Sequence, residues 1–355
     1  MCIEKWLILM MVERLQGQRS INGALYLLSG KRSAQTIQDA SLFNVLPLTA
    51  SLKHRPFDQL VKVKNILEKN NWIGEDATGK MTLTSYGRQQ LFSYQSRLSL
   101  PEYFNGGRFE WNGETDWFWQ RLSLFIQSLS NVLCAQSSFI PVQYDYNVQF
   151  WVKNHFPRNR SRQAIFSNGL YNELHTLLAE LPNEDAMLFV SRLSSSTRIG
   201  KTTSQLTENG SDEWHTFLRF RSVLHYIIGS ISKTERVKEF PSLTLFLMQE
   251  TEDGLLTKSA IKTLELLRQG CTIDEIPTLR GLKRSTIEDH IMEITLLAAD
   301  FPADYFLSRE KIALIQKTAK RLNTKRLKAI KTALGEEVDY FMIRLALADL
   351  KERVS

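Results

Sequence analysis

Charged and hydroxylated side chains that suit contact with a nucleic acid gather in one short segment of this chain. They are Lys283, Arg284, Ser285, Thr286 and, one helical turn later, Asp289 and His290. Lysine and arginine pair with phosphate oxygens, and hydroxyl, guanidinium and imidazole groups can donate hydrogen bonds to base edges. The segment therefore predicts contact with DNA, with Asp289 as the one member that would repel phosphate.

Capping patterns and a glycine turn indicate how this segment is held. Apolar residues at helical spacing over residues 257–270 predict a supporting helix that ends on Gly270. The S/T-x-x-E pattern of a capping box begins at Thr272 and again at Ser285. Between them, Gly281 can adopt the positive φ of a tight turn. The order of these features predicts a helix-turn-helix.

In a helix-turn-helix, the helix after the turn presents its first residues to the major groove. Arg280, at the start of the turn, is a further candidate DNA contact. Pro277 lies in the short helix between the two capping patterns, so we expect that helix to be shortened or bent. A helical hairpin that only packs, without touching DNA, is the alternative interpretation.

A second basic group follows in residues 309–331, a stretch that contains nine lysines and arginines and only one acid, Glu310. Interleaved apolar residues predict an amphipathic helix with a basic face, followed by a last helix over residues 336–353. Such a face suits phosphate contact, although a solvated charged surface is the commoner outcome. The candidate phosphate contacts are Lys320, Arg321, Lys325, Arg326 and Lys328.

Residues 1–98 predict a winged-helix-like domain. Helical segments are expected over residues 1–16 and after Ser20, Ser33 and Pro56, and a turn at residues 76–79 followed by alternating apolar residues predicts a β-hairpin wing.

This domain has two possible roles. Its candidate DNA contacts are Lys31, Arg32, Gln35 and Gln38. A domain used for protein interaction or dimerisation is the favoured alternative, because Glu75 and Asp76 on the hairpin would repel phosphate.

The middle of the chain predicts a connector over residues 99–114 and a helical domain over residues 115–235. Prolines at 141, 157 and 182 separate its helices, and its aromatic residues predict a core. A lesser candidate for phosphate contact is the tip formed by Arg198, Lys201 and Thr202.

One motif in this middle domain resembles the end of a nucleotide-binding P-loop, at Gly200 and Lys201. A P-loop needs a glycine five residues before Gly200, and Ser195 occupies that position. No βαβ pattern surrounds the motif, so we do not expect nucleotide binding.

Length and composition set the broad class. With 355 residues, 43% hydrophobic and 23% charged, the chain is expected to be globular with two or three domains. A net charge of +7 permits an anionic partner. The apolar run near the start is too short to span a membrane and lacks a cleavage site, so no membrane association is expected.

The cysteines and the titratable residues argue against a cofactor or a catalytic site. Cys2, Cys134 and Cys271 are far apart, which favours neither a disulfide framework nor a zinc site and is consistent with a reducing cytoplasm. We found no metal-ligand cluster, no nucleophile with a paired base and no carboxylate pair. The sequence therefore predicts a protein without metal, cofactor or enzymatic activity.

The C-terminal hundred residues resemble the helix-turn-helix domain associated with RecQ-type DNA helicases. The residues that carry this resemblance are residues 263–266, Gly270, residues 273–276, residues 280–282, residues 285–287, His290, Ile291, Tyr340, Ile343 and Arg344. The whole chain, including QTIQDASLF at residues 35–43, is similar to the bacterial YpbB family. Pro277 and Lys283 depart from the usual alanine and capping serine.

The resemblance implies a partner of a RecQ-like helicase, not a helicase, because the chain holds no motor motif. The first hypothesis is an adaptor in DNA replication or repair that binds DNA and the helicase, in the cytoplasm at the nucleoid. The alternative is a helix-turn-helix transcription regulator, which would prefer one short DNA sequence where the adaptor would show little preference.

Overall fold

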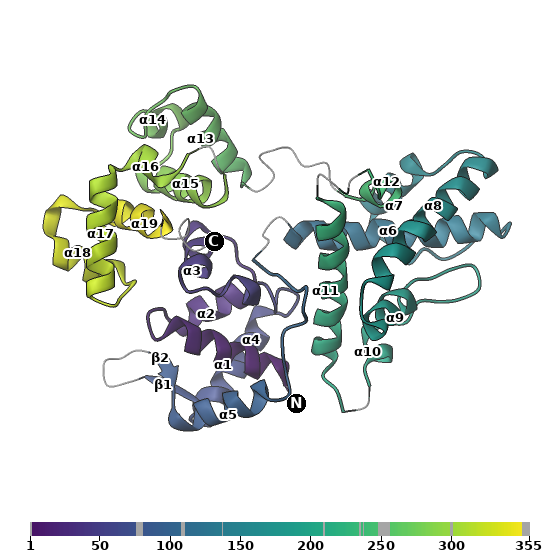
Figure 1. Cartoon of the computed structure of the whole chain (residues 1–355), viewed down its shortest axis with the longest axis horizontal. Coiled ribbons are helices and arrows are strands. Elements are labelled where there is room, and N and C mark those ends of the chain that lie inside the picture. Colours follow the sequence, from purple (N-terminus) through teal and green to yellow (C-terminus); the bar gives the residue numbers. More distant parts are fainter. Residues whose placement is uncertain are drawn as a thin grey trace. The chain divides into compact units, whose positions relative to one another are not determined.

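The structure is a computed structural model that describes residues 2–75, 81–107, 111–136, 138–208, 210–233, 236, 238–247, 256–298 and 301–349. Within these residues the fold is mainly helical (Figure 1), and two strands, β1 (Ile73–Glu75) and β2 (Met81–Leu83), pair antiparallel. The predicted mainly α fold with one small hairpin is confirmed. The turn predicted at residues 76–79 lies outside the described residues.

Two compact units make up the chain. The bipartite unit contains residues 4–97 and 250–355, and the middle unit contains residues 1–3 and 98–249. The sequence predicts the N-terminal and C-terminal segments as separate domains. In the structure these segments, which are far apart along the chain, pack together in the bipartite unit.

The N-terminal half of the bipartite unit begins with a helix that is buried nearly all round. Its elements are α1 (Ile3–Leu15), α2 (Ile21–Leu28), α3 (Ala34–Leu42), a 3-10 turn (Leu46–Leu48), α4 (Phe57–Lys69), the hairpin and α5 (Ser85–Gln95). Ser20 and Ser33 cap α2 and α3 through their hydroxyl oxygens, as predicted. Short capped helices around α1 therefore form this half.

The C-terminal half holds the helix-turn-helix. Its elements are α13 (Lys258–Arg268), α14 (Ile276–Arg280), α15 (Arg284–Leu297), α16 (Ala303–Phe306), α17 (Arg309–Arg321), α18 (Leu327–Leu334), a 3-10 turn (Gly335–Glu337) and α19 (Tyr340–Ala348). The single amphipathic helix predicted over residues 309–331 is wrong: it is two helices, because the chain turns at Asn323, whose φ is 45°. The last helix starts at Tyr340 under an Asp339 cap, later than predicted.

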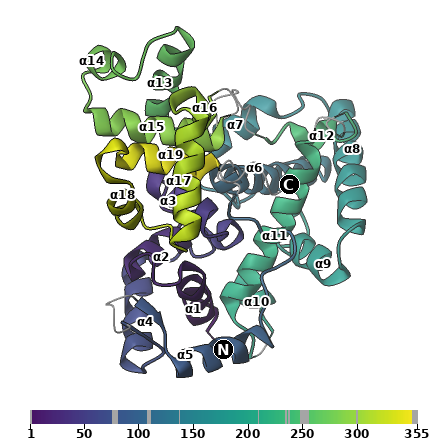
Figure 2. The same ribbon diagram turned by 60° about the vertical axis from the view of Figure 1, so that its left-hand side comes forward.

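Helix α15 joins the two halves. It packs against α13 and α19 of its own half and against α3 of the N-terminal half (Figure 2). The Glu293 carboxylate, on α15, is buried and accepts hydrogen bonds from the Thr257 amide at 2.7 Å and the Thr257 hydroxyl at 3.0 Å. It also pairs with the Arg32 guanidinium at 3.3 Å. One carboxylate therefore holds the start of α13 and the start of α3 together.

A second polar contact joins α3, α15 and α19. The buried Gln38 amide donates to the Arg344 carbonyl oxygen at 3.0 Å and accepts from the Arg344 guanidinium at 3.2 Å. The same guanidinium pairs with Asp289 at 2.8 Å. These hydrogen bonds and this ion pair connect α3, α15 and α19.

The middle unit is a helical bundle with an aromatic core. Its helices are α6 (Trp111–Leu133), α7 (Tyr146–His155), α8 (Arg160–Ala179), α9 (Asn183–Ser191), α10 (Thr203–Leu206), α11 (Glu213–Ile231) and α12 (Pro241–Thr244). Phe125 and Phe246 cross edge to face at the centre, with ring centroids 5.2 Å apart. His225 is buried beside Phe104, and burial lowers the pKa of its imidazole to about 3, as expected of a packed histidine.

The described helices place two further limits on the fold. None of them has both the length and the apolar character that a membrane-crossing helix requires. Among the same residues, no three histidine, cysteine, aspartate or glutamate side chains group as metal ligands would.

Replacing Glu293 by Gln should destabilise the bipartite unit, because the variant keeps the side-chain shape but loses the buried charge that Arg32 and Thr257 share. We expect a loss of about 2 kcal/mol in the free energy of unfolding, measured by urea denaturation. Glu265→Gln, at an exposed position on α13, is the matched control and should unfold like the parent protein. Equal stability of the two variants would contradict the role of Glu293.

Candidate nucleic-acid interface

The helix-turn-helix forms as α13, α14 and α15, and both predicted glycine turns are present. Gly270 follows α13 with a φ of +86°, and Gly281 follows α14 with a φ of +61°. Helix α14 is only five residues long and carries Pro277 in its first turn, where a missing backbone donor costs nothing. The proline therefore fits the first turn of this short helix without breaking it, and the helix ends at its C-cap, Gly281.

The predicted capping boxes form only in part. Glu275 accepts from the Thr272 amide at 2.8 Å and also from its hydroxyl, which is the reciprocal half of a box, and these bonds lower the pKa of the Glu275 carboxyl. The box predicted at Ser285 is wrong, because α15 has already begun there: its N-cap is Lys283, which makes no side-chain capping bond. The first amide groups of α15 are thus left without a side-chain cap.

The exposed tip of α15 carries less free charge than the sequence suggests. Lys283 and Ser285 are exposed, and Thr286 is half-buried. Arg284 pairs with Asp274 and, at 3.1 Å, with Glu288, and the bond to Asp274 raises the pKa of its guanidinium. Because exposed ion pairs of this kind contribute little stability, a phosphate or base edge could replace either carboxylate. Lys283 is the tip's cation without a partner among the described residues.

Two candidate contacts of the helix-turn-helix point inward, which corrects the sequence interpretation. His290 is buried against Thr263 at 3.0 Å, and burial, followed by the nearby Arg280 charge, lowers the pKa of its imidazole. Arg280 donates to the Ser259 carbonyl oxygen and to the Thr263 hydroxyl, both at 2.6 Å. Both side chains therefore brace the turn against α13 and do not read DNA. The spacing of His290 from Ile287 on the apolar face was the signal for this role.

The basic surface of α17 and α18 is better exposed. We call it the basic ridge, and it consists of Lys311, Lys317, Lys320, Arg321 and Lys328, which are exposed and form no ion pair within the described residues. Two other cations of this stretch have acidic partners instead: Arg309 pairs with Asp304 at 2.8 Å, and Lys331 with Glu336 at 3.2 Å. Three predicted phosphate contacts, at 320, 321 and 328, thus belong to the ridge.

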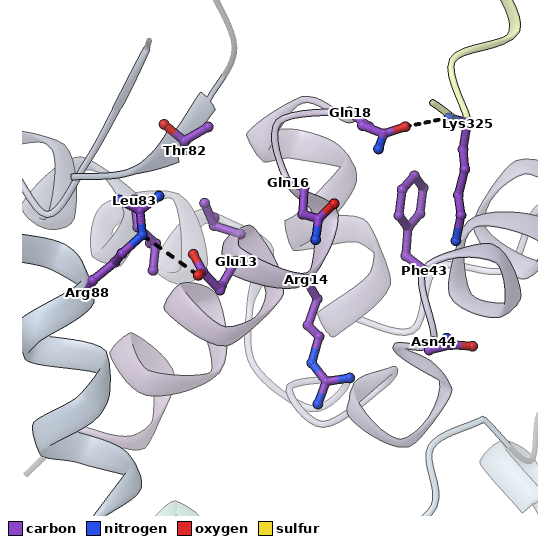
Figure 3. Close-up of a pocket in the computed structure, with 11 residues that line it drawn as sticks. Glu13, Arg14, Gln16, Gln18, Phe43, Asn44, Thr82, Leu83, Arg88 and Lys325 are labelled. Carbon is purple, nitrogen blue, oxygen red and sulfur yellow. Dashed lines mark hydrogen bonds and ion pairs between the residues drawn. The ribbon is translucent and has the colours of Figure 1, made fainter. Parts of the chain in front are cut away.

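The other two predicted phosphate contacts are turned into the protein. The Lys325 ammonium donates to the Leu42 carbonyl oxygen and lies 5.2 Å from the centre of the Phe43 ring (Figure 3). Burial lowers the pKa of this amine, and the neighbouring Arg19 charge lowers it further. Arg326 donates to the Gly17 carbonyl oxygen. These side chains fasten the α17–α18 turn to the N-terminal half, so they are unavailable to DNA.

A polar groove of about 630 Å³ lies beside this turn, between the end of α1 and strand β2. Its cations are Arg14, Lys325 and Arg88, and Arg88 faces Glu13 at 3.7 Å (Figure 3). Sequence reasoning missed Arg14 and Arg88, because nothing in the local pattern indicates that they approach residue 325. They place positive charge near the α17–α18 turn, which lies between Arg321 and Lys328 of the basic ridge.

Most of the candidate DNA contacts of the N-terminal half form hydrogen bonds or ion pairs inside the bipartite unit. Arg32 pairs with Glu293, and Gln38 is buried against Arg344, so these two candidate contacts are engaged inside the unit. Gln35 and Lys31 are both exposed; Gln35 donates to the Asp39 carboxylate at 2.9 Å, and the Lys31 ammonium lies 4.0 Å from the centre of the Tyr26 ring. Helix α3 therefore acts as a packing surface for α15.

The predicted tip of the middle unit also serves local structure. Arg198 donates to the Val190 carbonyl oxygen at 2.7 Å, and Thr202 caps α10 together with Gln205. Lys201 is exposed. Arg198 is exposed as well, so the segment closes a loop and offers two cations to solvent.

Arg280→Ala should lower the stability of the helix-turn-helix, because it leaves the Thr263 hydroxyl and the Ser259 carbonyl oxygen without their donor. We expect a loss of about 1 to 2 kcal/mol, measured by denaturation of the full chain. Lys283→Ala, three residues away and without a partner, is the control and should leave stability unchanged. If both variants unfold alike, Arg280 is not a brace.

Comparison with known proteins identifies the family. Residues 259–347 match the family model described as a helix-turn-helix domain, which covers α13 to α19. No solved structure matches the chain. The chain is 32% identical over 339 residues to Protein YpbB of Bacillus subtilis (strain 168), and the alignment covers 94% of each protein. At this identity and coverage, the chain belongs to the YpbB family.

Proposed function

We propose that this protein is a non-enzymatic DNA-binding adaptor that works with a RecQ-like helicase in DNA replication or repair. The observation that carries the DNA-binding part is the basic ridge, whose cations are exposed beside a helix-turn-helix and have no acidic partner among the described residues. Each lysine or arginine that neutralises a phosphate releases a counterion and adds to affinity. Binding then follows the phosphate backbone.

The burial of α15 supports weak sequence preference. Most of its residues from Ile287 to Ile294 are buried, and the helix packs against α13, α3 and α19, so mainly its first turn is free to approach base edges. In that first turn, Arg284 must first leave two carboxylates. A helix with one free cation and one free hydroxyl can make few hydrogen bonds that distinguish one base from another. Phosphate contacts would therefore supply most of the affinity for DNA.

The helicase partnership rests on the resemblance of the C-terminal residues to helicase-associated helix-turn-helix domains. An adaptor of this kind raises the effective concentration of helicase on DNA by binding both. Two compact units give such a tether separate surfaces, one of them for DNA in the bipartite unit. Residence at the nucleoid in the cytoplasm is part of the same proposal.

A transcription regulator is the second candidate. It is favoured by one feature, the uncapped and exposed first turn of α15 with Lys283, Arg284 and Ser285. A regulator would bind one short sequence much more tightly than random DNA, whereas the adaptor would not.

Reversing two charges of the basic ridge should weaken DNA binding for every sequence. For Lys320→Glu with Arg321→Glu we expect affinity at low salt to fall about tenfold or more, and the slope of log K against log salt to fall by about two. Fluorescence anisotropy with several duplexes and single strands measures both. The control is Lys69→Glu with Lys238→Glu, which makes the same change in net charge at exposed positions. Unchanged affinity in the ridge variant would rule out phosphate contact there.

The adaptor role predicts a separable effect on the helicase. With purified RecQ-like helicase from the same cell, the chain should bind in the absence of DNA, including after nuclease treatment. It should also increase unwinding of forked DNA when helicase is limiting. The ridge variant should still bind the helicase but lose the stimulation, because it no longer holds DNA. Binding that disappears with nuclease would refute the partnership.

A further inference from the structure

An apolar groove opens on the middle unit where α6, α7 and the start of α8 meet, and its volume is about 510 Å³. It is lined mainly by aliphatic, aromatic and proline side chains, namely Leu124, Val132, Phe139, Pro141, Val152, Phe156 and Pro157. The volume lies within the range of sites that take up organic ligands or anchoring side chains. The described lining offers apolar contact and contains no carboxylate.

Apolar side chains remain exposed in the segment beside this groove. Ile140 is 77% exposed, Tyr144 78% and Tyr146 75%, and Phe150 on the next turn of α7 is 54% exposed. The Tyr146 and Phe150 rings stack on each other with centroids 6.1 Å apart. Single exposed apolar residues are ordinary, but a group adjoining an apolar groove is typical of a surface that binds another chain.

The rim of the groove is positively charged. Between residues 117 and 172 the sequence contains only one acid, Asp145. The Asp145 carboxylate is already used, since it accepts from two amides at the start of α7. Lys153 and Arg158 line the groove, are exposed, and form no ion pair within the described part of the chain. An occupant therefore meets unpaired cations around an apolar floor.

We propose that this groove docks an acidic amphipathic peptide segment of a partner protein. Its apolar side chains, spaced along one helical face, fill the groove against Val132, Phe139 and Phe156. Its carboxylates pair with Lys153 and Arg158 at the rim. This is the helix-in-groove mode of recognition, in which apolar anchors supply affinity and complementary charge supplies specificity. The site is separate from the basic ridge and does not depend on DNA binding.

Single-stranded nucleic acid is the other class of ligand that combines rings with negative charge, and the groove fits it less well. Bases stack on the faces of exposed aromatic rings. Here most of the lining is aliphatic or proline, and the exposed Tyr146 and Phe150 rings cover each other. A concave apolar floor accommodates side chains better than flat bases.

The test uses the full chain and fluorescent peptides of about 18 residues, long enough for two or more helical turns on the groove. One peptide carries leucine and phenylalanine on one helical face and glutamate on the other. A second replaces every glutamate by lysine, and a third replaces the apolar face by alanine. We expect the acidic amphipathic peptide to bind at least about tenfold more tightly than either of the others.

Substitutions locate the binding. Lys153→Glu with Arg158→Glu should weaken the acidic peptide about tenfold and strengthen the lysine peptide, since the charges are exchanged. Val132→Asp, at a position 37% exposed, should weaken both peptides by placing a charge in the groove, with thermal unfolding as a check on the fold. Lys201→Glu with Lys238→Glu changes net charge equally at exposed positions of the same unit and should have no effect.

Three results would overturn the proposal. The acidic and lysine peptides could bind alike, or the Lys201 and Lys238 control could weaken binding as much as the groove variant, which would indicate general charge. A thymidine oligomer of about 20 nucleotides could bind instead and lose affinity in the Lys153 and Arg158 variant, which would assign the surface to nucleic acid. DNA binding by the basic ridge, measured separately, is unaffected by any of these results.

Discussion

The buried carboxylate of Glu293 is the contact on which the bipartite unit depends. A charge taken out of water costs several kcal/mol unless donors surround it. Here the donors come from opposite ends of the chain, the Thr257 amide and hydroxyl and the Arg32 guanidinium. If the two halves separate, the carboxylate loses its ion pair with Arg32, and α15 loses its packing against α3. The two segments are therefore expected to behave as one folding unit.

This arrangement changes what the helix-turn-helix can do. In a helix-turn-helix that reads DNA, the third helix keeps one face free along much of its length. Here α15 lies against α13, α3 and α19, and the residues that could have lined a free face, such as His290 and Glu293, bond within the unit. What remains is a short tip. The fold retains the helix-turn-helix topology while its third helix serves chiefly to join two halves of the chain.

The sequence predicted several caps and turns correctly but did not predict the long-range contacts, for a physical reason. Caps such as Ser20 and Ser33, and turns such as Gly281, depend on neighbours within a few residues, so their patterns are visible. The inward course of Lys325 and Arg326 depends on carbonyl oxygens at Leu42 and Gly17, about three hundred positions earlier. No periodicity of residues 309–331 carries that information.

Within the candidate site, long-range contacts that the sequence does not reveal also decide which cations face solvent. A net charge of +7 says little about binding, because Arg32, Arg280 and Lys325 already have internal partners that would have to be broken. Breaking such an internal partnership leaves a group inside the unit unpaired, which costs more than an exposed phosphate contact returns. Positive charge is effective where it is exposed and unmatched, as on the basic ridge and at the rim of the groove beside α7. The basic ridge runs along α17 and α18, which suits an extended phosphate backbone. The rim of the groove surrounds an apolar floor, which suits a segment that carries carboxylates beside apolar side chains.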